Sequence, residues 1–204
     1  IADLKFNIDE FGAIKNDYKV NGILKEGEIS IFRKNKIEKI NFVFNISENN
    51  FNFKDISFDT NNINFLSDRL NIKKGKRDYL IEGSIKNKES TLNNQSLQTI
   101  KLKYPQFDLI NTKFESKNDF SFNINDKFKV KNLALSSNIS INNSQLKRNN
   151  LINKNFIEIN EFIDLKDHKI KASYANKKLS IEGKGLVKLQ DKFELIDYDV
   201  MNNG

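Results

Sequence analysis

The sequence predicts an all-β protein whose main feature is a long, twisted and curled antiparallel sheet, open on one side as a groove. Apolar residues, mostly Phe and Ile, alternate with Asn, Lys, Asp and Ser along nearly the whole chain. A period of two places every second side chain on the same face of a pleated strand. Hydrophobic residues make up 38% of the chain, which suits a sheet with one apolar face better than one buried on both faces.

Strand-like runs follow one another through the first half of the chain. Asn-rich and Lys-Gly turns separate them at intervals of about 8–12 residues, the usual spacing in meandering β proteins. The clearest run is 37–47, in which Phe, Val and Ile alternate with Asn and Ser. The predicted strands in this half are 2–11, 18–24, 28–33, 37–47, 51–59, 63–66, 70–73 and 78–86.

The strand pattern is interrupted near 88–104 and resumes near Phe107. Ser90 could cap a short helix near 90–103, and Pro105 would end it, because the residue before proline avoids the helical region. The Asn- and Lys-rich stretch 142–154 is predicted to be a loop and a soft boundary within a single region, 1–204. The predicted strands in this half are 112–116, 119–124, 128–135, 137–141, 155–163, 170–174, 178–189 and 193–200.

A weak internal repeat places one glycine inside three similar strand patterns. The three copies are 18–25, 79–86 and 179–186, and their glycines are Gly22, Gly83 and Gly183. Glycine inside a strand predicts a β-bulge or a tight bend of the sheet.

Composition excludes several classes of function. The net charge is +7, but 34 basic and 27 acidic residues are interspersed, and the densest basic run, 73–77, reads as a hairpin turn, so we expect no nucleic-acid partner. Lys, Asn, Ile and Phe all have AT-rich codons, which indicates an AT-rich genome. The absence of Cys excludes disulfides and thiolate metal sites. No apolar stretch is long enough for a membrane-spanning helix, and the chain is expected to be a fragment of a longer protein.

The sequence offers little catalytic chemistry. His168 is the only histidine, and it lies near two aspartates; it could bind a metal or act as a base, or it could be an exposed turn residue, the favoured interpretation. Asp191, Glu194, Asp197 and Asp199 form an acidic stretch in which Asp197 and Asp199 would share a face of a strand. No Gly-rich phosphate loop and no Gly-x-Ser-x-Gly motif occurs. We therefore expect no enzyme, no metal site and no cofactor.

Several strand patterns together carry a resemblance to a known family. They are the polar–apolar run 4–9, Tyr-x-Val-x-Gly-x-Leu-Lys at 18–25, Gly-Glu-Ile-Ser-Ile at 27–31, Ile-Asn-Phe-Val-Phe-Asn-Ile at 40–46, and the runs at 53–58, 79–85, 128–135 and 179–183. Their arrangement resembles the AsmA-like superfamily of envelope proteins, which includes TamB-like and YhdP-like members. Members share a rhythm of strands more than fixed residues.

This resemblance implies a gutter-shaped sheet in the periplasm of a Gram-negative bacterium. Such a protein would be anchored to the inner membrane by a segment outside this fragment. It would assist phospholipid transport toward the outer membrane and outer-membrane biogenesis, with phospholipid acyl chains and envelope proteins as partners. The acyl chains would lie along the apolar face, on Phe42, Phe44, Ile46, Ile81, Ile85, Phe122 and Ile181.

The alternating pattern is also compatible with a closed β-sandwich, which is the favoured interpretation of the pattern taken alone. Two sheets would then bury their apolar faces on each other, and the chain would be a protein-interaction or surface module without lipid.

Overall fold

The computed structural model describes residues 1–31, 35–92, 107–148 and 162–202. Within these ranges the chain forms 11 β-strands and no helix. No helix that is long and apolar enough to cross a membrane is found among the described residues. The strands are β1 (Ala2–Lys5), β2 (Lys19–Ile31), β3 (Asn35–Ser47), β4 (Asn50–Thr60), β5 (Ile63–Lys74), β6 (Asp78–Leu92), β7 (Phe107–Asn125), β8 (Val130–Arg148), β9 (Phe162–Ala175), β10 (Lys178–Lys188) and β11 (Phe193–Asn202).

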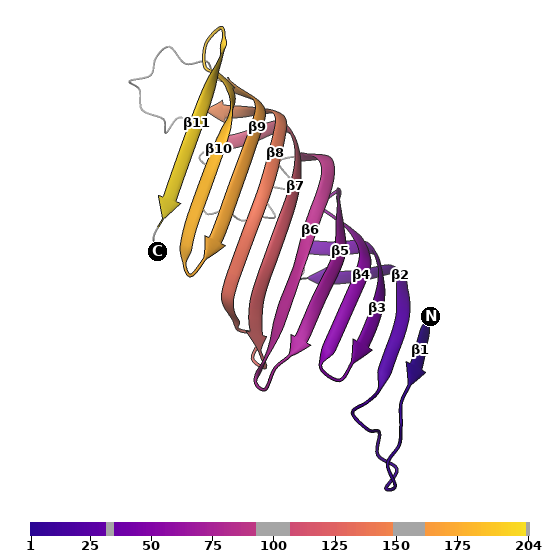
Figure 1. The fold of residues 1–204 in the computed structure, drawn as a ribbon. Helices are drawn as coiled ribbons and strands as arrows, with labels where there is room; N and C mark the ends of the chain where they lie inside the picture. Colours follow the sequence, from indigo (N-terminus) through magenta and orange to yellow (C-terminus); the bar gives the residue numbers. More distant parts are fainter. Residues whose placement is uncertain (32–34, 93–106, 149–161, 203–204) are drawn as a thin grey trace. The chain divides into compact units, whose positions relative to one another are not determined.

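All 11 strands belong to one antiparallel sheet that is not closed, and they follow one another across it in chain order (Figure 1). Each interior strand therefore pairs with the strand before it and the strand after it. The predicted fold class, all-β with an open antiparallel sheet, is confirmed. The described residues form one sheet, so the alternative of two sheets closed into a sandwich is not the fold.

The chain divides into two compact units. Unit 1 comprises 1–60, 64–86 and 118–135, and unit 2 comprises 61–63, 87–117 and 136–204. Strands β2, β3 and β4 lie wholly in unit 1, while β9, β10 and β11 lie wholly in unit 2. Strands β6, β7 and β8 contribute residues to both units.

Most strands are longer than the sequence pattern predicts. Residues that read as turns between two short strands lie inside one long strand. Thus β2 joins the predicted strands 18–24 and 28–33, β5 joins 63–66 and 70–73, β7 joins 112–116 and 119–124, and β8 joins 128–135 and 137–141.

The interruptions in these long strands include β-bulges. Glu26, Lys39 and Asp55 have positive φ angles of 54°, 50° and 51°, and the pairing register shifts by one residue beside each of them. Asp167 (φ 52°) lies at the corresponding shift between β9 and β10. A bulge inserts one extra residue in one strand and bends that strand. At Glu26 the left-handed backbone and the polar residues of the bulge resemble those of a turn, which is why the sequence pattern breaks there. The predicted strands 37–47 and 51–59 run unbroken through Lys39 and Asp55.

Two predicted elements are corrected. Ser90 lies in β6, which continues to Leu92, so no helix begins there; residues 93–103 lie outside the described residues. Strand β8 continues to Arg148, so 142–148 is strand rather than loop, and 149–154 lies outside the described residues. Polar side chains do not prevent pairing, because the ladder bonds are made by the backbone.

The buried core is small and largely polar. Among the described residues, Ile63 and Val187 are the only buried apolar side chains, 6% and 7% exposed. The buried polar residues are Ser67, Asn87, Thr112, Ser137, Ser144 and His168. Most apolar side chains of the sheet are therefore only partly covered by the rest of the protein.

Candidate functional site

One face of unit 1 is apolar across β2, β3 and β4. Cross-strand partners share a face, and the row Gly22–Phe44–Phe53 crosses all three strands. The ring of Phe42 makes edge contacts with Phe53 and Phe44 at centroid distances of 5.4 and 6.0 Å. We call this set the aromatic face; its members are Val20, Gly22, Leu24, Phe42, Phe44, Ile46, Phe51 and Phe53.

The aromatic face is incompletely covered. None of its members is buried; Leu24 is 37% exposed and the others are half-buried. The centre of a sandwich core would instead be shut off from solvent by the second sheet. Each Å² of this apolar surface that a partner covers would contribute about 25 cal/mol.

The opposite face of the same strands is mixed, with one row of asparagines and a next row that contains the exposed apolar residues Ile23 and Val43. Asn21, Asn45 and Asn52 are cross-strand partners, and the Asn45 side-chain amide donates a hydrogen bond to Asn21 Oδ1. The next row contains Ile23, Val43 and Lys54. Val43 is 38% exposed and lies beside Phe44 in the chain but on the other face, which makes it a useful comparison for Phe44.

The glycines of the internal repeat mark ring contacts rather than bulges. A Cβ atom at Gly22 would collide with the ring of Phe44, and one at Gly183 would collide with the ring of Tyr198. At Gly83 a Cβ would lie 3.0 Å from both Leu70 Cδ1 and Phe120 Cζ. No bulge lies at Gly22 or Gly183, because each pairs in register together with its neighbours on both sides, and the missing side chain makes room for a ring from a neighbouring strand.

The seven predicted lining residues are all half-buried and fall into separate groups. Phe42, Phe44 and Ile46 lie together on the aromatic face. Ile81 and Ile85 flank Gly83 on β6, on the face that also carries Phe120 and Phe122, whose ring centroids are 6.1 Å apart. Ile181 lies two residues from Gly183 in unit 2.

The aromatic face has members that the sequence prediction missed: Val20, Leu24, Phe51 and Phe53. Alternation shows which residues of one strand share a face, but the cross-strand register is needed to join strands. Pairing the repeat glycine Gly22 with Phe44, as a glycine opposite a ring, could have supplied the register between β2 and β3.

His168 is not the exposed turn residue that the sequence favoured. It lies within β9 directly after the bulge residue Asp167, it is 3% exposed, and its Nε2 is 3.0 Å from the carbonyl oxygen of Leu186. Gly185 leaves the space that the imidazole occupies. Among the described residues no group of three or more His, Cys, Asp or Glu side chains is placed to hold a metal. The contacts of His168 connect β9 to β10 beside a bulge.

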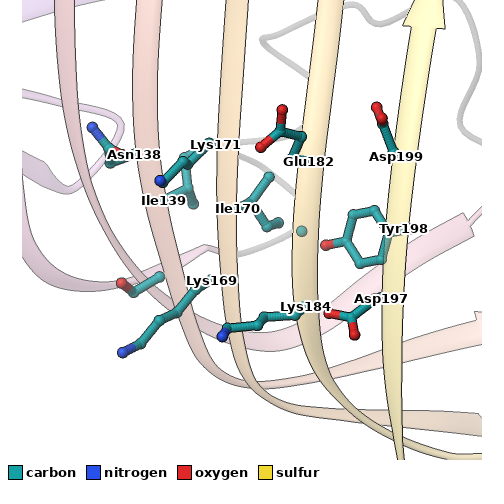
Figure 2. A pocket seen from close by; sticks show the side chains of 12 residues that line it. Asn138, Ile139, Lys169, Ile170, Lys171, Glu182, Lys184, Asp197, Tyr198 and Asp199 are labelled. Carbon is teal, nitrogen blue, oxygen red and sulfur yellow. The ribbon is translucent and has the colours of Figure 1, made fainter.

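Unit 2 contains a hollow of about 620 Å³, within the range of small-molecule sites. Three consecutive residues from each of β8, β9, β10 and β11 line it, and Figure 2 shows the Tyr198 ring reaching from β11 toward β10. The middle residues of the four triplets, Ile139, Ile170, Gly183 and Tyr198, are half-buried. Burial raises the pKa of the Tyr198 hydroxyl above its ordinary value.

The charged residues around this hollow balance one another. Lys169 and Lys184 share a cross-strand row with Asp197, while Lys171 shares a row with Glu182 and Asp199. As predicted for residues two apart in a strand, Asp197 and Asp199 share a face of β11, and both are exposed. Three lysines beside three carboxylates favour neither an anionic nor a cationic ligand.

A second hollow, of about 400 Å³, lies in unit 1 over β1 to β4. Its lining includes Gly22 and Phe44, so each hollow includes a glycine and the ring that covers it. No family model, no curated protein and no solved structure matches this chain.

Proposed function

We propose that the chain is a non-enzymatic, lipid-accommodating segment of an AsmA-like envelope protein. Phospholipid acyl chains would lie on the aromatic face, and the protein would assist phospholipid transport to the outer membrane. The proposal includes a periplasmic location and an inner-membrane anchor outside this segment. The observation that carries it is an apolar face spread over three neighbouring strands with no member buried.

An apolar surface of this kind is unfavourable in water, and hydrocarbon is its natural cover. The contacts of Phe and Ile with an acyl chain are non-directional, so one row of the face holds a methylene group about as well as the next row. Neighbouring strands lie about 4.8 Å apart, so equivalent contacts recur at that spacing across the sheet. A chain can therefore slide along the face without crossing a large barrier, and no cofactor or covalent step is needed.

The polar rows on the back of the sheet are consistent with this function. Its asparagines bond to one another, as in the contact between Asn45 and Asn21, and its lysines reach water. A lipid on the aromatic face would leave this polar side in contact with solvent. The sheet would then remain soluble while it carries hydrocarbon on one side only.

Native mass spectrometry of the purified chain, with lipid extraction, tests the proposal. The wild-type chain should carry co-purified phospholipid. Phe44→Asp should lose that lipid while keeping its β-type circular dichroism, because Phe44 is half-buried and a charge there can still reach water. Val43→Asp is the matched control: it places the same charge one residue away on the opposite face and should keep the lipid.

Two results would contradict the proposal. One is a wild-type chain that is free of phospholipid when purified from cells. The other is a Phe44→Asp chain that unfolds, as expected of an unpaired charge in a closed core. Equal lipid loss in both variants would also count against it.

A further inference from the structure

Two hairpin turns of unit 1 share one hydrogen-bonding scheme. In the first, Asp9 Oδ1 accepts from the backbone N–H of Phe11 and of Ala13, both at 2.9 Å, and the Asp9 carbonyl accepts from Gly12. In the second, Asn125 Oδ1 accepts from Lys127 at 3.1 Å and Lys129 at 2.9 Å, and the Asn125 carbonyl accepts from Phe128. Each turn is closed by a backbone bond from its first residue to the carbonyl of its fifth residue.

The two turns differ at the fourth position, where the backbone is left-handed. Gly12 occupies this position in the first turn with φ 84°, as such a turn favours. Phe128 occupies it in the second turn with φ 56°. A bulky residue with positive φ is a genuine outlier, because its Cβ crowds the backbone. The fold alone would be served better by glycine at position 128.

The Phe128 side chain contributes almost nothing to packing. It is 83% exposed, although Asn125 holds the backbone of its turn by four hydrogen bonds. The first turn likewise carries Phe11 at its tip, 87% exposed, with Ile8 and Ile14 below it at 55% and 61%. Both turns therefore hold a phenylalanine ring out into solvent on a well-ordered tip.

Exposed cations lie in the turns at the same end of unit 1. In an antiparallel meander every second turn falls at one end of the strands, as Figure 1 shows for unit 1. At this end the backbone N–H of Lys74, beside the β5–β6 turn, donates a hydrogen bond to the carbonyl of Asn49 in the β3–β4 turn. The ion pairs among the described residues involve other lysines. The β5–β6 and β7–β8 turns and the strand ends beside them carry six exposed cations, Lys73, Lys74, Lys76, Arg77, Lys127 and Lys129, and two acids, Asp78 and Asp126. Glu48 lies in the β3–β4 turn, and the segment that carries Phe11 is acidic, with Asp9, Glu10 and Asp17 against Lys15.

We propose that this end of unit 1 docks on the surface of an anionic lipid bilayer. Phe128 enters the interfacial region, while the six cations lie at the level of the headgroups; the acidic segment of Phe11 stays outside the bilayer. The combination of the exposed Phe128 ring and nearby Lys and Arg matches the requirements of interfacial binding, in which apolar insertion and attraction to anionic lipid act together. This surface lies at the hairpin tips and does not require the aromatic face to hold lipid.

The test is flotation of the 204-residue chain with vesicles of phosphatidylcholine and phosphatidylglycerol, against vesicles of phosphatidylcholine alone. The chain should bind the anionic vesicles and not the neutral ones, and binding should weaken with salt. Phe128→Gly should weaken binding about tenfold, since it removes one inserted ring. Urea unfolding should show that Phe128→Gly is at least as stable as wild type, because glycine relieves the left-handed strain.

Phe193→Ser is the matched control, because Phe193 is 45% exposed but lies on β11 in unit 2; its binding should equal that of wild type. Undiminished binding by Phe128→Gly would overturn the proposal, as would equal binding to neutral vesicles or a destabilised Phe128→Gly chain. Tight binding to a single-stranded oligonucleotide with no binding to vesicles would also overturn it. The phospholipid content of Phe128→Gly by native mass spectrometry separates the two proposals, because loading on the aromatic face should be unchanged.

Discussion

The ring of Phe44 on β3 lies directly over Gly22, its cross-strand partner on β2, and occupies the place of the missing side chain. Tyr198 on β11 has the same relationship to Gly183 on β10. In each pair the glycine exposes backbone that the ring covers, so the ring and the glycine form one packing unit. Both pairs line the hollows of their respective units.

The pair of Gly183 and Tyr198 should be energetically coupled. Gly183→Ala is expected to destabilise the protein by about 1–3 kcal/mol, because the new methyl displaces the ring. Tyr198→Ala should also destabilise the protein. The double variant should lose less free energy of unfolding than the sum of the two single losses, since the clashing ring is gone. Urea unfolding of the four proteins measures the coupling. The control Glu182→Ala, at an exposed neighbour of Gly183, should change stability by less than about 0.5 kcal/mol. Strictly additive losses of stability in Gly183→Ala, Tyr198→Ala and their double variant would count against the packing unit.

Asn41 should stabilise two bulges at once. Its Oδ1 accepts a hydrogen bond from the Glu26 backbone at 3.0 Å, and its Nδ2 donates to the Lys39 carbonyl at 2.7 Å. Asn41→Ala should therefore lower the free energy of unfolding by about 1–2 kcal/mol. Asn45→Ala, which removes an exposed amide from the same strand, should cost less. Equal losses in urea unfolding would show that Asn41 has no special role at the bulges.

Acid should weaken the contacts of Asp59. Hydrogen bonds from Asn64 Nδ2 at 2.7 Å and Lys39 Nζ at 2.9 Å hold the pKa of Asp59 below its ordinary value of 3.8. A lowered pKa in the folded state means that Asp59 contributes stability above its unfolded pKa and loses it as pH falls through the folded value. The contribution should be below about 1 kcal/mol, because the pair is largely exposed.

The check is urea unfolding of wild type and Asp59→Asn across acidic pH. The difference between the two should be constant near neutrality and should change below about pH 4. A difference that does not vary with pH would contradict the role of Asp59. Added salt should reduce the stability that Asp59 gains from the Lys39 ion pair and should leave the stability gained from the Asn64 hydrogen bond unchanged.

The buried hydroxyls of Thr112 and Ser144 should depend on each other. They lie 2.5 Å apart in unit 2 and are 2% and 3% exposed. Thr112→Val removes this partner from the Ser144 hydroxyl and should cost about 1–3 kcal/mol. Combining it with Ser144→Ala should recover part of the loss, because neither polar group is then left buried. Thermal unfolding measures the stability of the single and double variants. A double variant whose loss of stability equals the sum of the two single losses would argue against the pairing.

The alternating pattern was enough to predict antiparallel strands and the faces of single strands, but it did not separate an open sheet from a closed sandwich. Phe42, Phe44 and Ile46 lie on one face as predicted, because the period of two is a local property of the extended chain. Strand lengths were predicted poorly, because residues such as Glu26 adopt the same left-handed backbone in a bulge as in a turn. Only the partner strand distinguishes the two, by continuing to pair beyond the extra residue.

His168 shows the same limit for a side chain. Its polar neighbours in the sequence predict a solvent-exposed turn, yet the space above Gly185 on the next strand accommodates the imidazole. The two residues are 17 positions apart in the sequence, so no local pattern connects them. Phe128 is the opposite case: its exposure follows from a turn whose hydrogen bonds are local.

Alternation acts through neighbouring residues, so it specifies antiparallel strands and the two faces of each strand without any distant contact. Tertiary structure decided which strands continue through a bulge, which glycine receives which ring, and that the aromatic face of unit 1 stays half-exposed. These features depend on the register between strands, and register is set by contacts between residues that are distant in the sequence.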